Sequence, residues 1–177
     1  MHNRYFLAAF AALLVSTGAR ANESGFYLGA AVGEASQTGQ GFKGSDTSFE
    51  WLAGYSFNKY LAAEAGFVDA GTQRDTVDSV DLKVASDGTF AALLVKLPLG
   101  RIVAPYARVG YVFYDSTTTA SSGAARASEF FSDEDLLYGA GLEFRVSGRF
   151  RLRAEYERVD VPDVRFGIYS FVATFQF

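Results

Sequence analysis

The chain ends on Gly167-Ile-Tyr-Ser-Phe-Val-Ala-Thr-Phe-Gln-Phe177, where apolar side chains alternate with small or polar ones. One face of this two-residue period carries the apolar set Tyr169, Phe171, Ala173, Phe175 and Phe177. Such alternation is typical of a β-strand with one aromatic face. An exposed aromatic edge strand invites aggregation, whereas a closed barrel has no free edge. The stretch therefore predicts the closing strand of a membrane barrel, and its aromatic residues with the terminal Phe177 resemble the signal that barrel-insertion machinery reads.

The N-terminal end predicts a secretory signal peptide over residues 1–21. Arg4 precedes the apolar run Tyr5–Val15, and Ala19-Arg20-Ala21 follows as an A-x-A cleavage site. The alternative is a short N-terminal membrane helix, but the run is about half of the ~20 residues that a spanning helix needs. We therefore expect a mature chain from Asn22 and one barrel domain over residues 22–177.

Composition argues against several classes of function. The formal net charge is −4, and removing the signal peptide, which holds two arginines and no acidic residue, makes it −6. An acidic chain is a poor nucleic-acid binder, because such binding depends on Lys and Arg. The sequence has no Cys, and its single His is His2 in the signal peptide. We therefore expect no enzymatic activity, no cofactor and no metal; the acidic run Asp133-Glu134-Asp135 is interpreted as solvated.

Two-residue alternation recurs along the chain and predicts eight strands. These are Gly25–Glu34, Thr47–Phe57, Tyr60–Ala70, Gly88–Leu97, Val103–Asp115, Glu134–Val146, Arg149–Val159 and Gly167–Phe177. Their lengths suit tilted membrane strands, which need about 9–11 residues. The even number of strands predicts that both termini are periplasmic.

The connections between these strands alternate between short and long, as in outer-membrane barrels with short periplasmic turns and longer extracellular loops. The expected long loops are Ala35–Asp46, Gly71–Asp87 and Ser116–Asp133, with a shorter fourth loop at Asp160–Phe166. Within the third, the polar stretch Ser116–Gly123 is expected to be flexible. The alternative architecture is a soluble lipocalin-like barrel with its apolar face inside. It is disfavoured because the bulky aromatics share one face while glycines and charges, which fit a narrow lumen, share the other.

Charged residues concentrate on the non-aromatic faces of the strands. Arg151, Arg153, Glu155 and Glu157 share one face of a single strand, and the same alternation adds Glu64, Lys96, Arg108, Glu143 and Arg145. An Arg or Lys facing lipid near the bilayer midplane would cost about 2–4 kcal/mol, so these side chains are expected in the lumen. The favoured interpretation is an ion-pair plug that fixes strand register. The alternative is a gate that exchanges partners and opens a narrow water path.

Six strand segments share a recognisable ordered pattern: Phe26–Gly33, Tyr60–Phe67, Val95–Pro98, Pro105–Gly110, Tyr138–Phe144 and Leu152–Tyr156. Together they resemble the transmembrane domain of the outer-membrane protein A (OmpA) family. The resemblance implies an all-β, eight-stranded antiparallel up-and-down barrel. It also implies an inward Glu64–Arg153 pair, with Lys96 and Glu143 as alternative partners. The family's inward Lys on the first strand is replaced here by Ala31 or a neighbour, and the stop at Phe177 predicts that the family's peptidoglycan-binding domain is missing.

These observations predict an integral protein of the bacterial outer membrane. The first hypothesis is a structural role in membrane integrity with loops displayed at the surface. The alternatives are an adhesin or host-interaction and serum-resistance barrel that acts through its loops, and a narrow pore of low conductance. The expected partners are outer-membrane lipids and lipopolysaccharide, the barrel-assembly machinery during insertion, and an extracellular ligand at the loops.

Overall fold

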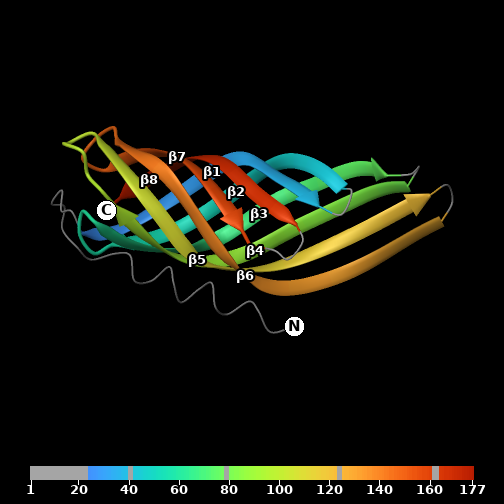
Figure 1. Cartoon of the computed structure of the whole chain (residues 1–177). Helices are drawn as coiled ribbons and strands as arrows, with labels where there is room; N and C mark the ends of the chain where they lie inside the picture. The colour runs from blue at the N-terminus through green and yellow to red at the C-terminus, as the bar shows by residue number, and fades with distance from the viewer. Residues whose placement is uncertain (1–23, 40–41, 78–79, 123–124, 161–163) are drawn as a thin grey trace.

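The computed structural model describes residues 24–39, 42–77, 80–122, 125–160 and 164–177, and the predicted signal peptide lies outside them. Eight strands follow one another: β1 (Gly25–Gly39), β2 (Phe42–Ser56), β3 (Leu61–Val77), β4 (Val80–Lys96), β5 (Val103–Ser122), β6 (Ala125–Arg145), β7 (Phe150–Val159) and β8 (Arg165–Gln176). Each strand pairs antiparallel with the next, and β1 pairs with β8 to close the barrel (Figure 1). The predicted fold class is confirmed. No helix among the described residues is long and apolar enough to span a membrane.

The two faces of the sheet have opposite chemistry. Most bulky aromatic and aliphatic side chains point outward; Trp51 is 66% exposed and Phe171 is 72% exposed. Along β7 the charged residues Arg151, Arg153, Glu155 and Glu157 are buried, whereas Leu152 and Tyr156 between them are exposed. This is the pattern of a membrane barrel, since lipid covers the apolar outer band and the polar groups must find partners inside.

Strands β1 to β6 are longer than the sequence predicts, and the three expected long loops are wrong in extent. Most of Ala35–Asp46, Gly71–Asp87 and Ser116–Asp133 continues the barrel strands as paired hairpins. The β5–β6 register runs without a break from Val103↔Phe144 to Ser122↔Ala125. The β3–β4 and β5–β6 hairpins reach farthest from the end where the C-terminus lies (Figure 1).

The prediction fails there because the hairpins extend beyond the membrane-spanning part of the barrel. Beyond the membrane both faces of a strand meet water, so apolar alternation disappears while backbone pairing continues. Polar cross-strand contacts take its place, such as Ser86–Ser116 at 3.1 Å and Thr119–Ser128 at 3.2 Å between hydroxyl oxygens. The polar stretch expected to be flexible is strand through Ser122.

One irregularity interrupts the β3–β4 ladder at the base of its hairpin. The register shifts between Asp69 and Thr72, and Gly71 in the bulge has a φ of +72°. Asp46 of β2 ties the bulge down, since its carboxylate accepts hydrogen bonds from the backbone N–H of Thr72 and of Thr47, each at 2.8 Å. A bulge of this kind is a specific local feature held by a side chain from the neighbouring strand.

Candidate functional site

The centre of the lumen holds a buried arginine–glutamate pair that bridges opposite walls of the barrel. Arg153 of β7 donates from Nη1 to Oε1 of Glu64 on β3 at 2.5 Å, and from Nη2 to Oε2 at 3.4 Å. The hydroxyl of Tyr27 on β1 donates to the same Glu64 Oε1 at 2.7 Å. Arg153 is 1% exposed and Glu64 is 3% exposed, so both charges depend on each other rather than on water.

A second group of charges lies on the short-turn side of this pair. Lys96 of β4 donates to Glu143 Oε2 at 2.6 Å, and Arg151 Nε lies 3.8 Å from the other oxygen of Glu143. Glu143 stands directly opposite Arg153 in the β6–β7 register. The family's alternative partners are therefore neighbours of the central pair.

A third group surrounds Arg108 of β5 on the loop side. Its guanidinium lies 3.2 Å from Glu50, 3.3 Å from Glu155 and 3.8 Å from Glu64, and it is also paired with Glu157. The group lies over the ring of Phe90, with the guanidinium carbon 4.4 Å from the ring centroid. Arg108 thus pairs with four carboxylates from three strands, and it is 2% exposed.

Glu155 links the Arg108 group to the central pair. It accepts hydrogen bonds from the hydroxyls of Tyr106 and Ser170 and lies 3.8 Å from Arg153 Nη2. The central pair and the Arg108 group therefore form one connected network, and the Lys96–Glu143–Arg151 group lies beside it as a separate ion-paired group. A closed network of this kind fills the lumen. Glu64 needs only a short movement to exchange one arginine for the other, because it already lies near both Arg108 and Arg153.

The structure brings together every predicted lumen residue except one. Glu64, Lys96, Glu143, Arg153, Arg108, Arg151, Glu155 and Glu157 are buried inside the barrel. The predicted lumen position of Arg145 is wrong. Arg145 is the last residue of β6, and its side chain is exposed at the rim because the barrel wall ends there.

Sequence reasoning missed four members of the network, namely Glu50, Tyr27, Tyr106 and Ser170. Glu50 faces the lumen by the same alternation that identified Glu64, so the signal was present in the second strand. Tyr27 and Tyr106 also fall on inward positions. The period alone does not tell which carboxylate a hydroxyl will reach, and their roles emerge only from the closed barrel.

Three carboxylates on the loop side of the lumen lie close to one another, as the ligands of a metal ion would. Oxygens of Glu50, Glu155 and Glu157 lie within 4.8 Å of one another. Arg108 is ion-paired with all three, so its guanidinium supplies the positive charge that a metal would bring. The donor set therefore fits an arginine clamp better than a cation site.

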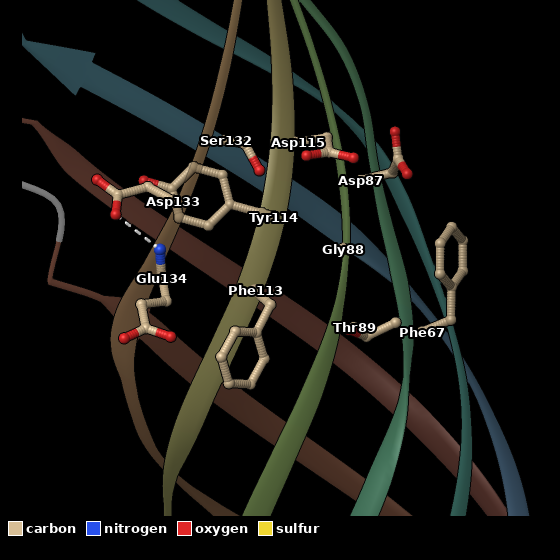
Figure 2. A pocket seen from close by; sticks show the side chains of 10 residues that line it. All are labelled: Phe67, Asp87, Gly88, Thr89, Phe113, Tyr114, Asp115, Ser132, Asp133 and Glu134. Atoms are coloured by element: carbon tan, nitrogen blue, oxygen red, sulfur yellow. Dashed lines mark hydrogen bonds between the residues drawn. The ribbon is translucent and has the colours of Figure 1, made fainter. Parts of the chain in front are cut away.

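A second candidate site is a hollow of about 470 Å³ on the β3–β6 wall toward the loop end (Figure 2). Phe67, Thr89 and Phe113 line its lower part, and the carboxylates of Asp87 and Asp115 lie above them (Figure 2). Asp87 and Asp115 are directly opposed across β4 and β5. Asp133 and Glu134 line the same hollow, so the acidic run of the sequence lies at its edge.

The predicted insertion-signal residues lie on the outer face of the closing strand. Tyr169 is 63% exposed, Phe175 43% and Phe177 46%, with Phe171 between them. Tyr169 packs against Tyr156 of β7 with ring centroids 4.4 Å apart, and Phe175 meets Phe177 edge-on at 5.6 Å. Their recognition by insertion machinery stays a prediction.

Comparison with known proteins agrees with this architecture. The chain is 28% identical over 162 residues to the attachment invasion locus protein of Yersinia pseudotuberculosis, covering 88% of this chain and 85% of the relative. Among solved structures, that of Ail, the attachment invasion locus protein of Yersinia pestis, in complex with the heparin analogue sucrose octasulfate, has a TM-score of 0.63 at 22% identity. The match covers 88% of this chain and 99% of that one. Neisserial surface protein A has a TM-score of 0.65 at 21% identity, with 91% and 100% covered.

The N-terminal β-barrel domain of Pseudomonas aeruginosa OprF shares the same fold, with a TM-score of 0.54 at 12% identity and coverage of 84% and 97%. The resemblance to OmpA-like barrels is thereby confirmed. The profile of the family described as outer membrane protein beta-barrel domain matches residues 5–177. The chain therefore belongs to this family and is an integral outer-membrane β-barrel protein.

Proposed function

We propose that this protein is a surface-interaction barrel, whose plugged lumen anchors rigid hairpins that bind an extracellular ligand. The observation that carries the proposal is the uninterrupted β5–β6 pairing, which continues to Ser122↔Ala125. A paired hairpin holds its side chains in fixed positions, so binding loses less conformational entropy than it would with a flexible loop. The attachment invasion locus relative supports the same class of function by its name.

The β5–β6 hairpin also carries two exposed aromatic side chains. Phe130 is 66% exposed and Phe131 is 54% exposed, and they stand opposite Thr117 and Ser116 in the register. Neighbouring residues of a strand point to opposite faces, so each face of the hairpin presents one phenyl ring. Exposed aromatics within a polar surface are the usual anchors of a protein interface.

The charge of the loop end favours a basic ligand. Acidic residues outnumber basic ones among the described residues with solvent-accessible side chains in this half of the barrel. The acidic set is Glu34, Asp46, Asp69, Asp75, Asp81, Asp87, Asp115, Glu129, Asp133, Glu134, Asp135 and Asp160, and the basic set is Lys43, Arg74, Lys83, Arg158 and Arg165. Charge complementarity then favours a basic protein surface over a sulfated sugar such as the one bound to the Yersinia pestis protein.

A shortened hairpin tests this proposal. Replacing Thr117–Phe130 by Asn-Gly keeps the Ser116↔Phe131 pair next to a two-residue turn that suits a hairpin. Cells that display this variant should lose attachment to cultured host cells, while the purified barrel keeps its heat-dependent gel migration. Beads coated with a lysine-rich peptide should bind the unaltered protein better than heparin beads do. Undiminished attachment by the shortened variant would contradict the proposal.

A structural role in the outer membrane is the second candidate function. It is favoured by the filled lumen, in which Arg108 and Arg153 are each 2% exposed or less.

The pore hypothesis is tested by single-channel recording in planar bilayers. The unaltered protein should give no steps above leak, whereas Arg153→Ala should produce them if partner exchange can open a path.

The orientation and partners follow the same proposal. The short turns and both chain ends lie in the periplasm, and the hairpins lie outside the cell. Lipopolysaccharide and other outer-membrane lipids surround the aromatic band, and the barrel-assembly machinery reads the closing strand during insertion. Nucleic acid, enzymatic chemistry and cofactors have no place in this function.

A further inference from the structure

Exposed cations gather at the short-turn end of the barrel. Lys59 lies in the turn between β2 and β3, Arg101 in the turn between β4 and β5, and Arg145 and Arg149 flank the turn between β6 and β7. The side chains of all four are exposed. The described residues of these turns, 57–60, 97–102 and 145–149, include no Asp or Glu. None of the four cations forms an ion pair among the described residues, so their charge is available to a partner.

Three of these cations converge on one place. Lys59, Arg101 and Arg145 line a small hollow beside Ile102, although they come from three different turns. Its volume is about 20 Å³, which is room for roughly one water-sized group such as a phosphate oxygen. Glu143 also lines the hollow, but its carboxylate is already paired with Lys96 at 2.6 Å.

The turns that carry these cations are held by hydrogen bonds. Asn58 Oδ1 accepts from the backbone N–H of Tyr60 at 2.7 Å and of Leu61 at 2.9 Å. The backbone N–H of Arg145 donates to the carbonyl of Ile102 at 2.8 Å, which joins the β4–β5 turn to β6. The backbone positions of the cations are therefore fixed relative to one another, and only their long side chains need to be ordered on binding.

Apolar side chains accompany the cations in the same turns. Leu99 is 58% exposed, Ile102 is 64% exposed and Val146 is 60% exposed, while Lys59 Nζ lies 5.1 Å from the ring centroid of Tyr60. Aliphatic groups at turn tips are unfavourable in water, and a cation beside them is unfavourable in hydrocarbon. The boundary between lipid headgroups and acyl chains satisfies both requirements.

We propose that this cationic collar, formed by Lys59, Arg101, Arg145 and Arg149, binds the phosphate groups of anionic phospholipids in the leaflet next to the short turns. The collar holds the headgroups while Leu99, Ile102 and Val146 contact the acyl chains beside them. The opposite end of the barrel is acidic, so anionic phospholipid is selected at one end only. That this leaflet is the periplasmic one rests on the proposed orientation; the binding itself does not.

Purified protein in nanodiscs tests the collar. One lipid mixture is phosphatidylcholine alone, and the other contains phosphatidylcholine with phosphatidylglycerol. Lipids retained on the protein are identified by native mass spectrometry. The unaltered protein should retain phosphatidylglycerol in excess of its share of the bilayer, and 0.5 M salt should reduce the excess because exposed charges are screened.

A charge-matched pair of variants locates the effect. Lys59→Gln/Arg101→Gln/Arg145→Gln should weaken phosphatidylglycerol retention by about fivefold for each cation removed. Lys43→Gln/Arg74→Gln/Lys83→Gln removes the same charge from the loop end and should leave retention unchanged. If the first variant fails to fold, as judged by heat-dependent gel migration, Arg101→Gln alone tests the site, because that turn residue has no hydrogen-bonded side chain among the described contacts.

Three results would overturn the proposal: equal retention of the two lipids by the unaltered protein, equal losses in both triple variants, or displacement of the lipid by 10 mM inorganic phosphate, roughly a tenfold excess over a millimolar site. The last would mean that a free phosphate site, not a lipid site, is present. These readouts use a symmetric bilayer and no host ligand. Failure of the collar and failure of the surface-interaction function are therefore distinguishable.

Discussion

The lumen and the loop-end hairpins are built from the same strands, yet they treat charge in opposite ways. In the lumen Arg108 alone contacts four carboxylates, and every cation there is buried. On the described hairpins the ion pair is Arg74–Asp46, at 3.9 Å and largely exposed. Closing a strand into a barrel forces its polar face to satisfy itself, whereas the same strand beyond the membrane leaves its charges free for a partner.

This difference between the lumen and the hairpins should be measurable in the free energy of unfolding of substituted variants. Breaking a buried pair by removing one partner costs about 3–5 kcal/mol, because the other charge is left buried and unpaired. An exposed pair contributes about 0–1 kcal/mol. Substitutions in the lumen should therefore change stability, and substitutions on the hairpins should change binding.

Arg153→Met should have the largest effect on stability. It leaves Glu64 buried without its main partner, and the free energy of unfolding should fall by about 3–5 kcal/mol. Urea unfolding in lipid vesicles, followed by gel migration, measures the change. The double variant Glu64→Gln/Arg153→Met removes both charges and should recover a large part of the loss. An Arg153→Met midpoint equal to that of the unaltered protein would contradict the role of the central pair.

Gly54→Val should have the next largest effect. A Cβ at this position would lie 2.3 Å from the ring of Tyr27, whose hydroxyl donates to Glu64 at 2.7 Å. Overpacking of this kind costs about 1–3 kcal/mol, and it should also weaken the Tyr27–Glu64 hydrogen bond. Ala65→Val, on the lipid-facing side of β3, is the control and should be nearly neutral in the same urea titration. Similar midpoints for both variants would argue against a tightly filled lumen.

Asp46 should make the stability of the bulge at the base of the β3–β4 hairpin depend on pH. Hydrogen bonds from the backbone N–H of Thr72 and Thr47 lower the pKa of its carboxyl below the ordinary value of 3.8. Because the folded-state pKa is the lower one, this stabilisation is complete above pH 3.8 and is lost as the pH falls through the folded-state value.

Hydrogen exchange at the Thr72 amide measures this effect. After correction for intrinsic exchange, protection should decrease on acidification in the unaltered protein. Asp46→Asn should show no such step and should have weaker protection at neutral pH. A pH-dependent step that survives in Asp46→Asn would assign the effect to another group.

Phe130→Ser should have the smallest effect on stability. The side chain is exposed on a water-facing hairpin, so the free energy of unfolding should change by no more than about 0.5 kcal/mol. Attachment to host cells should nevertheless fall, because an aromatic anchor is lost. Normal attachment by both Phe130→Ser and Phe131→Ser would remove these aromatics from the proposed interface.

The sequence predicts the membrane part of this molecule well and its outer part poorly. Within the bilayer one face must be apolar, so alternation reports both the strand and the side that faces inward, as for Arg153 and Glu157. Outside the bilayer both faces are polar, and the strand residues 116–122 look like a loop.

Which charged side chains become partners in the lumen depends on the register of the strands and on the closure of the barrel. Alternation places Glu64 and Arg108 inside, but their separation depends on how strands distant in sequence face one another. Arg145 shows a similar limit at the rim. Alternation places its side chain on the inward face, but the barrel wall ends at this residue, so the side chain is exposed.

Labelling from outside the cell tests the central claim most directly, which is that the hairpins are the exposed surface and the short turns are not. The chain has no Cys, so a single introduced thiol reports one position. In intact cells a membrane-impermeant maleimide should label Phe130→Cys and should not label Arg101→Cys until the outer membrane is permeabilised. Labelling of Arg101→Cys in intact cells, with Phe130→Cys protected, would contradict the account.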